Sequence, residues 1–340
     1  MDLVLSIADE YLLDKAWAVL VPASVFVTPS VDANVNASLS LASVALPIVS
    51  PPTSWHQLLV SYLPHPPLPS PCDILLPVSA WPRDYVPRQL ISLSVVTLIG
   101  IFFLYVLFAA LSYQYIFNHD MMNHPRFLKD QVKLEIQCSL RAFPGMTLLT
   151  LPWFQAEVRG YSRLYDNVGD YGLAYLLFSI PFFLIFTDYG IYWVHRTLHH
   201  PSIYKYVHKP HHKWLIPTPF ASHAFHPLDG YLQSVPYHLF IFLFPLHRWL
   251  YLGLFVFVNF WSILIHDSDM ITGHALENVI NGPAHHTLHH LYFTVNYGQY
   301  FTWADRWGGS YRQPASELDP LLEALAAKET KMKEALTKEE

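Results

Sequence analysis

Residues 171–199 read YGLAYLLFSIPFFLIFTDYGIYWVHRTLH, an apolar stretch that runs directly into a pair of histidines. A helix needs about 20 predominantly apolar residues to cross a bilayer, so residues 171–194 are predicted to form a membrane span. His195 and His199 follow at i and i+4, which places both rings on one face of the same helix. The stretch therefore predicts a membrane helix that ends in a histidine-rich site.

Two further groups of histidines repeat this pattern, HKPHH at 208–212 and HTLHH at 286–290. We call the three groups the histidine boxes, and we expect each box to aim its imidazoles at one point. Imidazole is the commonest protein metal ligand and suits iron, copper and zinc. Because the boxes offer more nitrogens than one ion takes, they predict a site for two metals. The predicted ligands from the boxes are His195, His199, His208, His211, His212, His286, His289 and His290.

The composition indicates an all-α polytopic membrane protein, since 52% of the residues are hydrophobic and only 14% are charged. A soluble chain carries about 25% charged residues. Residues 91–117 form a second predicted span, 139–154 a weaker one, and 234–265 a helical hairpin that turns at residues 245–248. The expected fold is a bundle of about four spans, two of them as the hairpin, with a cytosolic helical cap that holds the di-metal site. No basic stripe with interleaved aromatics indicates nucleic-acid binding.

Three regions are expected along the chain: a Pro-rich interfacial or lumenal region at 1–90, a membrane domain with the boxes at 91–315, and a charged helical tail at 316–340. Cytosolic loops are enriched in Lys and Arg. The segments around the boxes are therefore predicted to be cytosolic, because they carry Arg196, Lys205, Lys209 and Lys213. The acceptor triplet at Asn36 fits a lumenal N-terminal region.

Asp188 lies inside the span that precedes the first box, where an ionisable residue is costly and usually functional. It either supports the metal site, because it shares a helix face with His195, or caps the helix end near the interface. The chain has no Glu-x-x-His pair and no His-Glu-x-x-His motif, which argues against a carboxylate-bridged di-iron bundle and a zincin-type hydrolase. An all-imidazole site in a lipid-facing protein favours redox metals that activate dioxygen.

Four stretches carry a resemblance to a known family. They are TDYGIYWVHRTLHHP (187–201), HKPHHKWLIPTPFASHAFHPLDGYLQS (208–234), FVNFWSILIHDSDM (257–270) and NGPAHHTLHHLYFTVNYGQYFTWADRWGGSYRQP (281–314). The chain resembles the membrane fatty-acid-hydroxylase and sterol-desaturase superfamily, and within it the fungal sterol C5-desaturases of the lathosterol oxidase type. The resemblance extends back to about residue 120.

The resemblance implies an oxidoreductase of the endoplasmic reticulum membrane that uses two irons and O2 to convert a Δ7-sterol, such as an episterol-like molecule, into the 5,7-diene of ergosterol-type biosynthesis. Electrons would come from NAD(P)H through cytochrome b5 and its reductase. By motif, His226 and His266 join the eight box histidines as metal ligands, and His223 is a weaker candidate. Thr218 and Asp188 are the candidate catalytic residues.

Two other functions remain open from the sequence. A sterol C4-methyl oxidase or lipid hydroxylase would share the same first hydrogen abstraction, although the sequence around the second box favours C5-desaturation. A histidine-rich membrane metal transporter belongs to a different class. A transporter would place its ligands at the midplane of broken spans, whereas the boxes here follow the ends of helices on one side.

Overall fold

The computed structural model describes residues 1–23 and 78–339, and the chain is mostly helical there. The chain divides into two compact units, Met1–Val96 and Thr97–Glu340. Most of the Pro-rich stretch and the triplet at Asn36 lie outside the described residues.

The first unit consists of three short helical segments and the beginning of a long helix. The segments are α1 (Asp2–Ala8), a π-helical turn (Asp9–Leu13) and α2 (Asp14–Leu20), and the long helix is α4 (Val86–Tyr115). Buried Arg88 pairs with Asp9 at 2.9 Å and also with Asp14. The Trp17 indole donates to Ser92 at 3.0 Å. These contacts attach the N-terminal helices to the first turns of α4.

Among the described residues, two helices are long and apolar enough to cross a membrane, α4 and α6 (Gly172–Leu198). They confirm that the predicted spans at 91–117 and 171–194 are apolar helices of membrane-crossing length. Large apolar side chains remain exposed along both helices, for example Phe103 at 65% and Leu177 at 59%. Exposed apolar surface of this extent indicates a lipid environment. The weaker predicted span at 139–154 lies inside the longer helix α5 (Gln131–Val158).

The predicted hairpin is present as α8 (Pro227–Leu243) and α9 (Arg248–Leu264). Strand β2 (Leu246–His247) lies at its turn and pairs in parallel with β1 (Leu164–Tyr165). The hairpin packs against α6 through an aromatic and aliphatic core that includes Phe183, Phe240 and Leu254.

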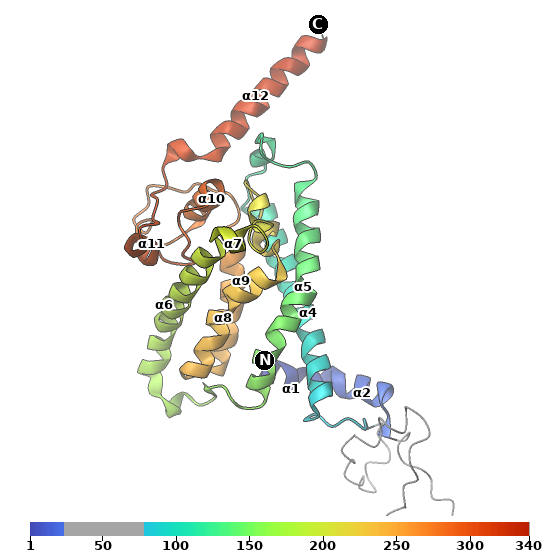
Figure 1. Cartoon of the computed structure of the whole chain (residues 1–340). Helices are drawn as coiled ribbons and strands as arrows, with labels where there is room; N and C mark the ends of the chain where they lie inside the picture. The colour runs from blue at the N-terminus through green and yellow to red at the C-terminus, as the bar shows by residue number, and fades with distance from the viewer. Residues whose placement is uncertain (24–77, 340) are drawn as a thin grey trace, which may run out of the picture. The chain divides into compact units, whose positions relative to one another are not determined.

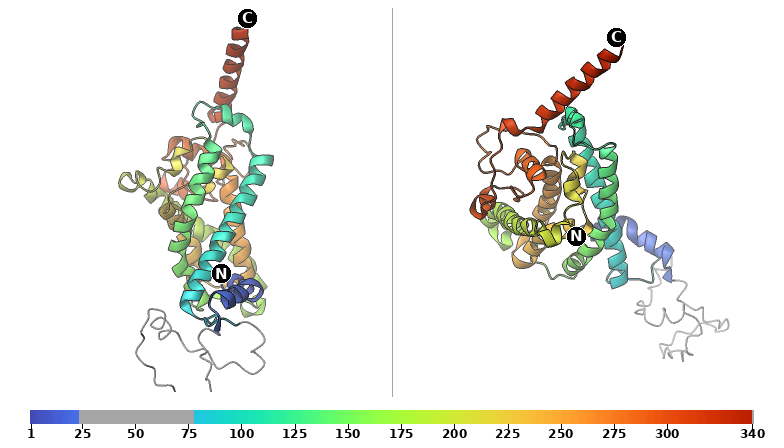
Figure 2. Two further views of the ribbon diagram at one scale, coloured as in Figure 1. Left: turned by 90° about the vertical axis from the view of Figure 1, so that its right-hand side faces the viewer. Right: turned by 45° about the horizontal axis from the view of Figure 1, so that its top comes forward.

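Short helices and turns complete the second unit: η4 (His119–Asn123), η5 (Val168–Asp170), α7 (Pro201–Tyr204), η6 (His211–Lys213), η7 (Pro219–His223), α10 (Pro283–Tyr292), α11 (Trp303–Gly308), η8 (Ser316–Leu318) and α12 (Pro320–Glu339). Helices α7, α10 and α11 lie at the C-terminal end of α6 (Figure 1). The charged tail forms α12, whose first turns pack on η4 and whose end extends away from the other helices (Figure 2). The histidine boxes therefore meet at one end of α6.

Candidate metal centre

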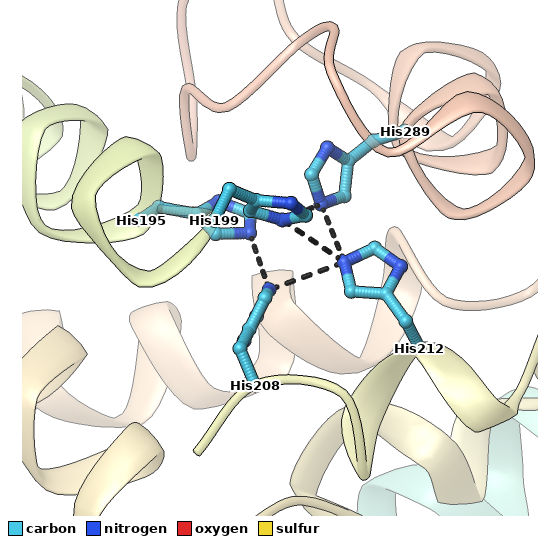
Figure 3. A group of neighbouring side chains, drawn as sticks. All are labelled: His195, His199, His208, His212 and His289. Atoms are coloured by element: carbon cyan, nitrogen blue, oxygen red, sulfur yellow. Dashed lines mark hydrogen bonds between the residues drawn. The ribbon is translucent and has the colours of Figure 1, made fainter. Parts of the chain in front are cut away.

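Ring nitrogens of five histidines converge between α6, the segment after α7, and α10. The Nε2 atoms of His195 and His208 lie 3.1 Å apart, and Nε2 of His212 lies 3.1 Å from those of both His199 and His208. Figure 3 shows the rings of this five-histidine group pointing toward one another from three parts of the chain. Its members are His195, His199, His208, His212 and His289.

A second set of four histidines, all buried, converges in the same way. Nε2 of His286 lies 3.0 Å from Nε2 of His266 and 3.1 Å from that of His290. Nε2 of His266 is also 3.3 Å from that of His211. This four-histidine group combines η6, α10 and the residues that follow α9.

The second and third boxes are divided between the two groups. In α10, His286 and His290 are one helical turn apart and serve the four-histidine group, whereas His289 serves the five-histidine group. Successive residues of a helix are turned by about 100°, so the neighbours His289 and His290 point to different groups. His211 and His212 diverge in the same way. The expectation that each box aims at one point was therefore wrong for these two boxes. The two convergent groups agree with the predicted site for two metals, which stays a prediction.

Hydrogen bonds on the other ring nitrogen orient five of the rings. In each case Nδ1 faces an atom that only accepts: for His195 the Tyr297 carbonyl at 3.0 Å, and for His208 the Asp229 carboxylate at 2.7 Å. The rings of His266, His289 and His290 bond in the same way to the carbonyls of Ser262, Val295 and Trp214. Nδ1 therefore carries the proton, and Nε2 of the neutral ring presents its lone pair to the group.

This tautomer decides what the groups can bind. His195 and His208 both donate through Nδ1, so their two Nε2 atoms cannot hydrogen-bond to each other. In the other group, Nε2 of His286 faces two accepting nitrogens and can donate to only one of them. Lone pairs held about 3 Å apart repel unless a cation lies among them. Two nitrogens that bind one metal at about 2.1 Å, at right angles, would be about 3.0 Å apart, so the donor sets fit metal ions.

Burial keeps the rings neutral and ready to bind a cation. It lowers the pKa of His211, His212, His286 and His290 well below the ordinary histidine value, and neighbouring imidazoles add to the effect. Burial also lowers the pKa of His266, to about 3. A ring that stays unprotonated keeps its Nε2 lone pair available at neutral pH.

His226, the predicted tenth ligand, lies outside both groups. Its side chain is exposed and serves as the N-cap of α8, where Nδ1 accepts a hydrogen bond from the Leu228 amide at 3.2 Å. A residue that begins a helix directs its side chain to the free amides of the first turn. His223, the weaker candidate, bonds to Ser222 and Asn259 and also stands apart, whereas His266 is a member of the four-histidine group.

The two candidate catalytic residues do not bond to a ring of either group in the described part of the chain. Oδ1 of Asp188 accepts from the backbone amides of residues 299–301. The hydroxyl of Thr218 donates to Glu135, a buried residue of α5, and accepts from the Phe220 amide at 3.3 Å. Both residues therefore bind backbone amides rather than the rings.

Sequence reasoning missed Asp229, whose carboxylate bonds directly to His208. It lies in the first turn of α8, where acidic residues are common because they favour the helix N-terminus. No sequence signal separates that role from support of a metal ligand. Asp305, which binds backbone close to His195, was missed for the same reason, because it lies in the first turn of α11.

Comparison with known proteins places this centre in a family. A family model described as fatty acid hydroxylase matches residues 180–310, which include every histidine of both groups. A Delta(7)-sterol 5(6)-desaturase of Gibberella zeae is 58% identical over 253 residues, which cover 74% of this chain and 78% of that protein. The chain belongs to the fatty acid hydroxylase family. The resemblance seen in the sequence is thereby confirmed.

Two further relatives agree with this placement. A Delta(7)-sterol 5(6)-desaturase of Schizosaccharomyces pombe is 57% identical over 232 residues, or 68% of this chain and 76% of that protein. The lathosterol oxidase of Homo sapiens is 54% identical over 240 residues, or 70% of this chain and 80% of that protein. No solved structure matches the chain.

Proposed function

We propose that this chain is a Δ7-sterol 5(6)-desaturase, which removes one hydrogen from C5 and one from C6 of a Δ7-sterol to give the 5,7-diene. The observation that carries the proposal is the name shared by relatives that are 45–58% identical, Delta(7)-sterol 5(6)-desaturase. The two sets of Nε2 donors supply a suitable site. In the balanced reaction, the sterol loses two hydrogens, O2 takes up two electrons and two protons, and two waters form.

The metals in this proposal are two irons, one in each histidine group, and they supply the dioxygen activation that no side chain can perform. Imidazole nitrogens are suitable ligands for iron. The protein's part is to hold the Nε2 lone pairs in place, through carbonyls and Asp229 on Nδ1, and to keep water away. Apart from His199, which is half-buried, every ring of both groups is buried. A dry, preorganised site limits side reactions of the activated oxygen.

Asp188 and Thr218 act in this proposal as positioning residues. Asp188 holds the backbone of residues 299–301, and Thr218 joins Glu135 to the segment that follows the second box. His226 remains a predicted tenth ligand, but its hydrogen bond to Leu228 does not support that role.

The membrane arrangement of this proposal has about four spans, α4, α6 and the two arms of the hairpin α8–α9, in the endoplasmic reticulum. Because α4 and α6 both end at the histidine cap, α5 must return the chain between them. Its support is the apolar character of these helices, although the arms have 17 residues each and are short for a bilayer. The histidine cap would face the cytosol, where cytochrome b5 and its reductase would deliver electrons from NAD(P)H. Exposed Lys205, Lys209 and Lys213 favour both the cytosolic side and an acidic electron donor.

The test is the sterol profile of cells that lack this protein and their own C5-desaturase. Expression of the wild-type chain should convert accumulated Δ7-sterols into 5,7-dienes, and His211→Ala should not, because it removes a ligand of the four-histidine group. His200→Ala is the matched control, since the His200 side chain is exposed and bonds only to Ser202 in the described part of the chain. Unchanged Δ7-sterols with the wild-type chain would refute the proposal, and loss of C4-methyl groups or a hydroxylated product would favour the related alternatives.

A further inference from the structure

Five successive backbone amides, from Tyr297 to Phe301, donate to only two carboxylates. The amides of Tyr297 and Gly298 donate to Asp305, one to each oxygen, at 2.8 Å. The next three donate to a single oxygen of Asp188 at 2.9, 2.7 and 3.2 Å. Both carboxylates are buried and come from different helices: Asp188 of α6 is 0% exposed and Asp305 of α11 is 1% exposed. We call residues 297–301 with these two carboxylates the amide clamp.

The amide clamp is hydrogen-bonded to a predicted metal ligand, His195. The carbonyl of Tyr297 accepts the Nδ1 proton of His195 at 3.0 Å. The Tyr297 ring also lies 5.1–5.5 Å, centroid to centroid, from the rings of His195, His199 and His289. The Gly298 amide belongs to the same planar peptide unit as the Tyr297 carbonyl. The bond from this amide to Asp305 therefore fixes the direction of the carbonyl and of the ring that bonds to it.

We infer that Asp188 and Asp305 are positioning residues for the five-histidine group, which act through the Tyr297 carbonyl on His195. This inference rests on the proposed function only in taking the group as a metal site. An ordinary loop of five residues would satisfy its amides with water or nearby carbonyls. A loop whose amides are all bound by buried carboxylates has a fixed conformation, and a fixed outer partner holds a metal-binding imidazole in its productive orientation and tautomer.

The two carboxylates differ in a way that separates geometry from charge. Asp188 uses only Oδ1, and its Oδ2 is buried without a hydrogen-bond partner in the described part of the chain. Asp305 uses both oxygens: Oδ1 accepts from the Tyr297 amide and Oδ2 from the Gly298 amide. Its Oδ1 also accepts from the Ser310 hydroxyl at 2.7 Å. An asparagine can therefore keep every bond at 188, whereas at 305 its amide nitrogen must face an N–H or O–H donor. Both substitutions remove the same negative charge.

Gly298 gives a test that leaves both carboxylates intact. A Cβ at this position would lie 2.5 Å from the Phe301 carbonyl oxygen and 3.1 Å from Oδ2 of Asp305. Gly298→Ala must therefore shift the loop. Gly253→Ala is the matched control, since a Cβ there meets nothing within 4 Å.

The experiment measures the release of iron from the purified, iron-loaded chain to an excess of chelator. The wild type should release its metal in two phases, one for each group. Asp305→Asn and Gly298→Ala should accelerate one phase on the order of 10- to 100-fold and leave the other phase unchanged. Asp188→Asn and Gly253→Ala should release iron at nearly the wild-type rates, and Asp188→Ala should behave like Asp305→Asn.

Three results would overturn the inference: wild-type release from Asp305→Asn and Gly298→Ala, equal acceleration by the two asparagine variants, or acceleration of both phases together. Equal effects would indicate charge alone, and the loss of both phases would indicate general unfolding. Sterol profiles of the same variants separate this inference from the proposed function. A wild type that binds iron in two phases but forms no 5,7-diene refutes the sterol assignment and leaves the clamp standing.

Discussion

At the scale of the residue, Asp229 is the carboxylate that bonds to a ring of the centre. Its Oδ2 accepts from Nδ1 of His208 at 2.7 Å, and its Oδ1 accepts from Gln233 at 2.7 Å. A carboxylate behind a metal-binding imidazole raises the basicity of the ring and fixes its tautomer. We therefore predict that Asp229→Asn weakens iron binding to the five-histidine group on the order of 10- to 100-fold, measured by equilibrium competition with a chelator.

Gln233→Leu is the control for this prediction, because it removes the neighbour of Oδ1 and leaves the charge and the bond to His208 in place. Iron affinity of the control should stay close to that of the wild type. An Asp229→Asn protein that binds iron as tightly as the wild type would show that His208 needs no carboxylate.

The histidines of the two groups could be predicted from the sequence, whereas most of the groups that hold their rings could not. Nine of the ten predicted histidines lie in the two groups. They could be recognised because residues three or four apart in the sequence lie on one face of a helix. The supports are mostly backbone carbonyls, such as those of Tyr297 and Trp214, and every residue has a carbonyl. Asp229 reaches His208 across 21 residues, so no local pattern joins them.

At the scale of the element, the contact between α6 and α8 depends on Gly190. A Cβ at this position would lie 2.8 and 2.9 Å from ring carbons of Pro236, which cannot move aside as a flexible side chain can. We predict that Gly190→Ala lowers the free energy of unfolding by about 1–2 kcal/mol, since overpacking outweighs the helix propensity of alanine. The midpoint of thermal unfolding in detergent measures the effect.

Gly100→Ala in α4 is the matched control, because a Cβ there meets nothing within 4 Å and the helix is also apolar. Its unfolding midpoint should be unchanged or slightly higher. Equal midpoints for the two alanine variants would mean that α6 and α8 can separate at this contact without cost.

Apolar length predicted α4, α6 and the hairpin, but it did not predict the start of α5. That helix begins at Gln131, eight residues before the apolar run at 139. Its first turns bury Gln131 and Glu135, which a hydropathy pattern assigns to solvent. They are buried because Gln131 donates to the Ile216 carbonyl at 2.7 Å and Glu135 accepts from Thr218. Such partners lie more than 80 residues away, so only the folded chain shows why these polar residues are inside.

At the scale of the whole molecule, the centre joins elements that are distant in the sequence. Its histidines come from α6 and its C-cap, the segment after α7, the residues after α9, and α10. Metals that bind only the folded arrangement stabilise it by mass action. Removal of the metals should therefore loosen all of these elements together rather than one helix.

The same buried rings predict how stability depends on pH. Burial lowers the pKa of His211, His212, His286, His289 and His290 well below the ordinary value of 6.5. In the unfolded chain these rings take up protons below about pH 6.5, whereas in the folded chain they remain neutral. Their contribution to stability is therefore fully present above about pH 6.5 and is lost as the pH falls, by about 1.4 kcal/mol per pH unit for each ring.

We accordingly predict that the midpoint of thermal unfolding of the metal-free chain falls steeply between about pH 7 and pH 5. Iron loading should raise the midpoint most at neutral pH, because protons and metal compete for the same Nε2 atoms and acid favours the protons. His211→Gln should flatten the acid dependence of the metal-free chain, since it removes one buried ring that resists protonation. A midpoint that stays constant across this range would mean that the rings are protonated equally in the folded and unfolded chain, and the neutral donor set could not then be correct.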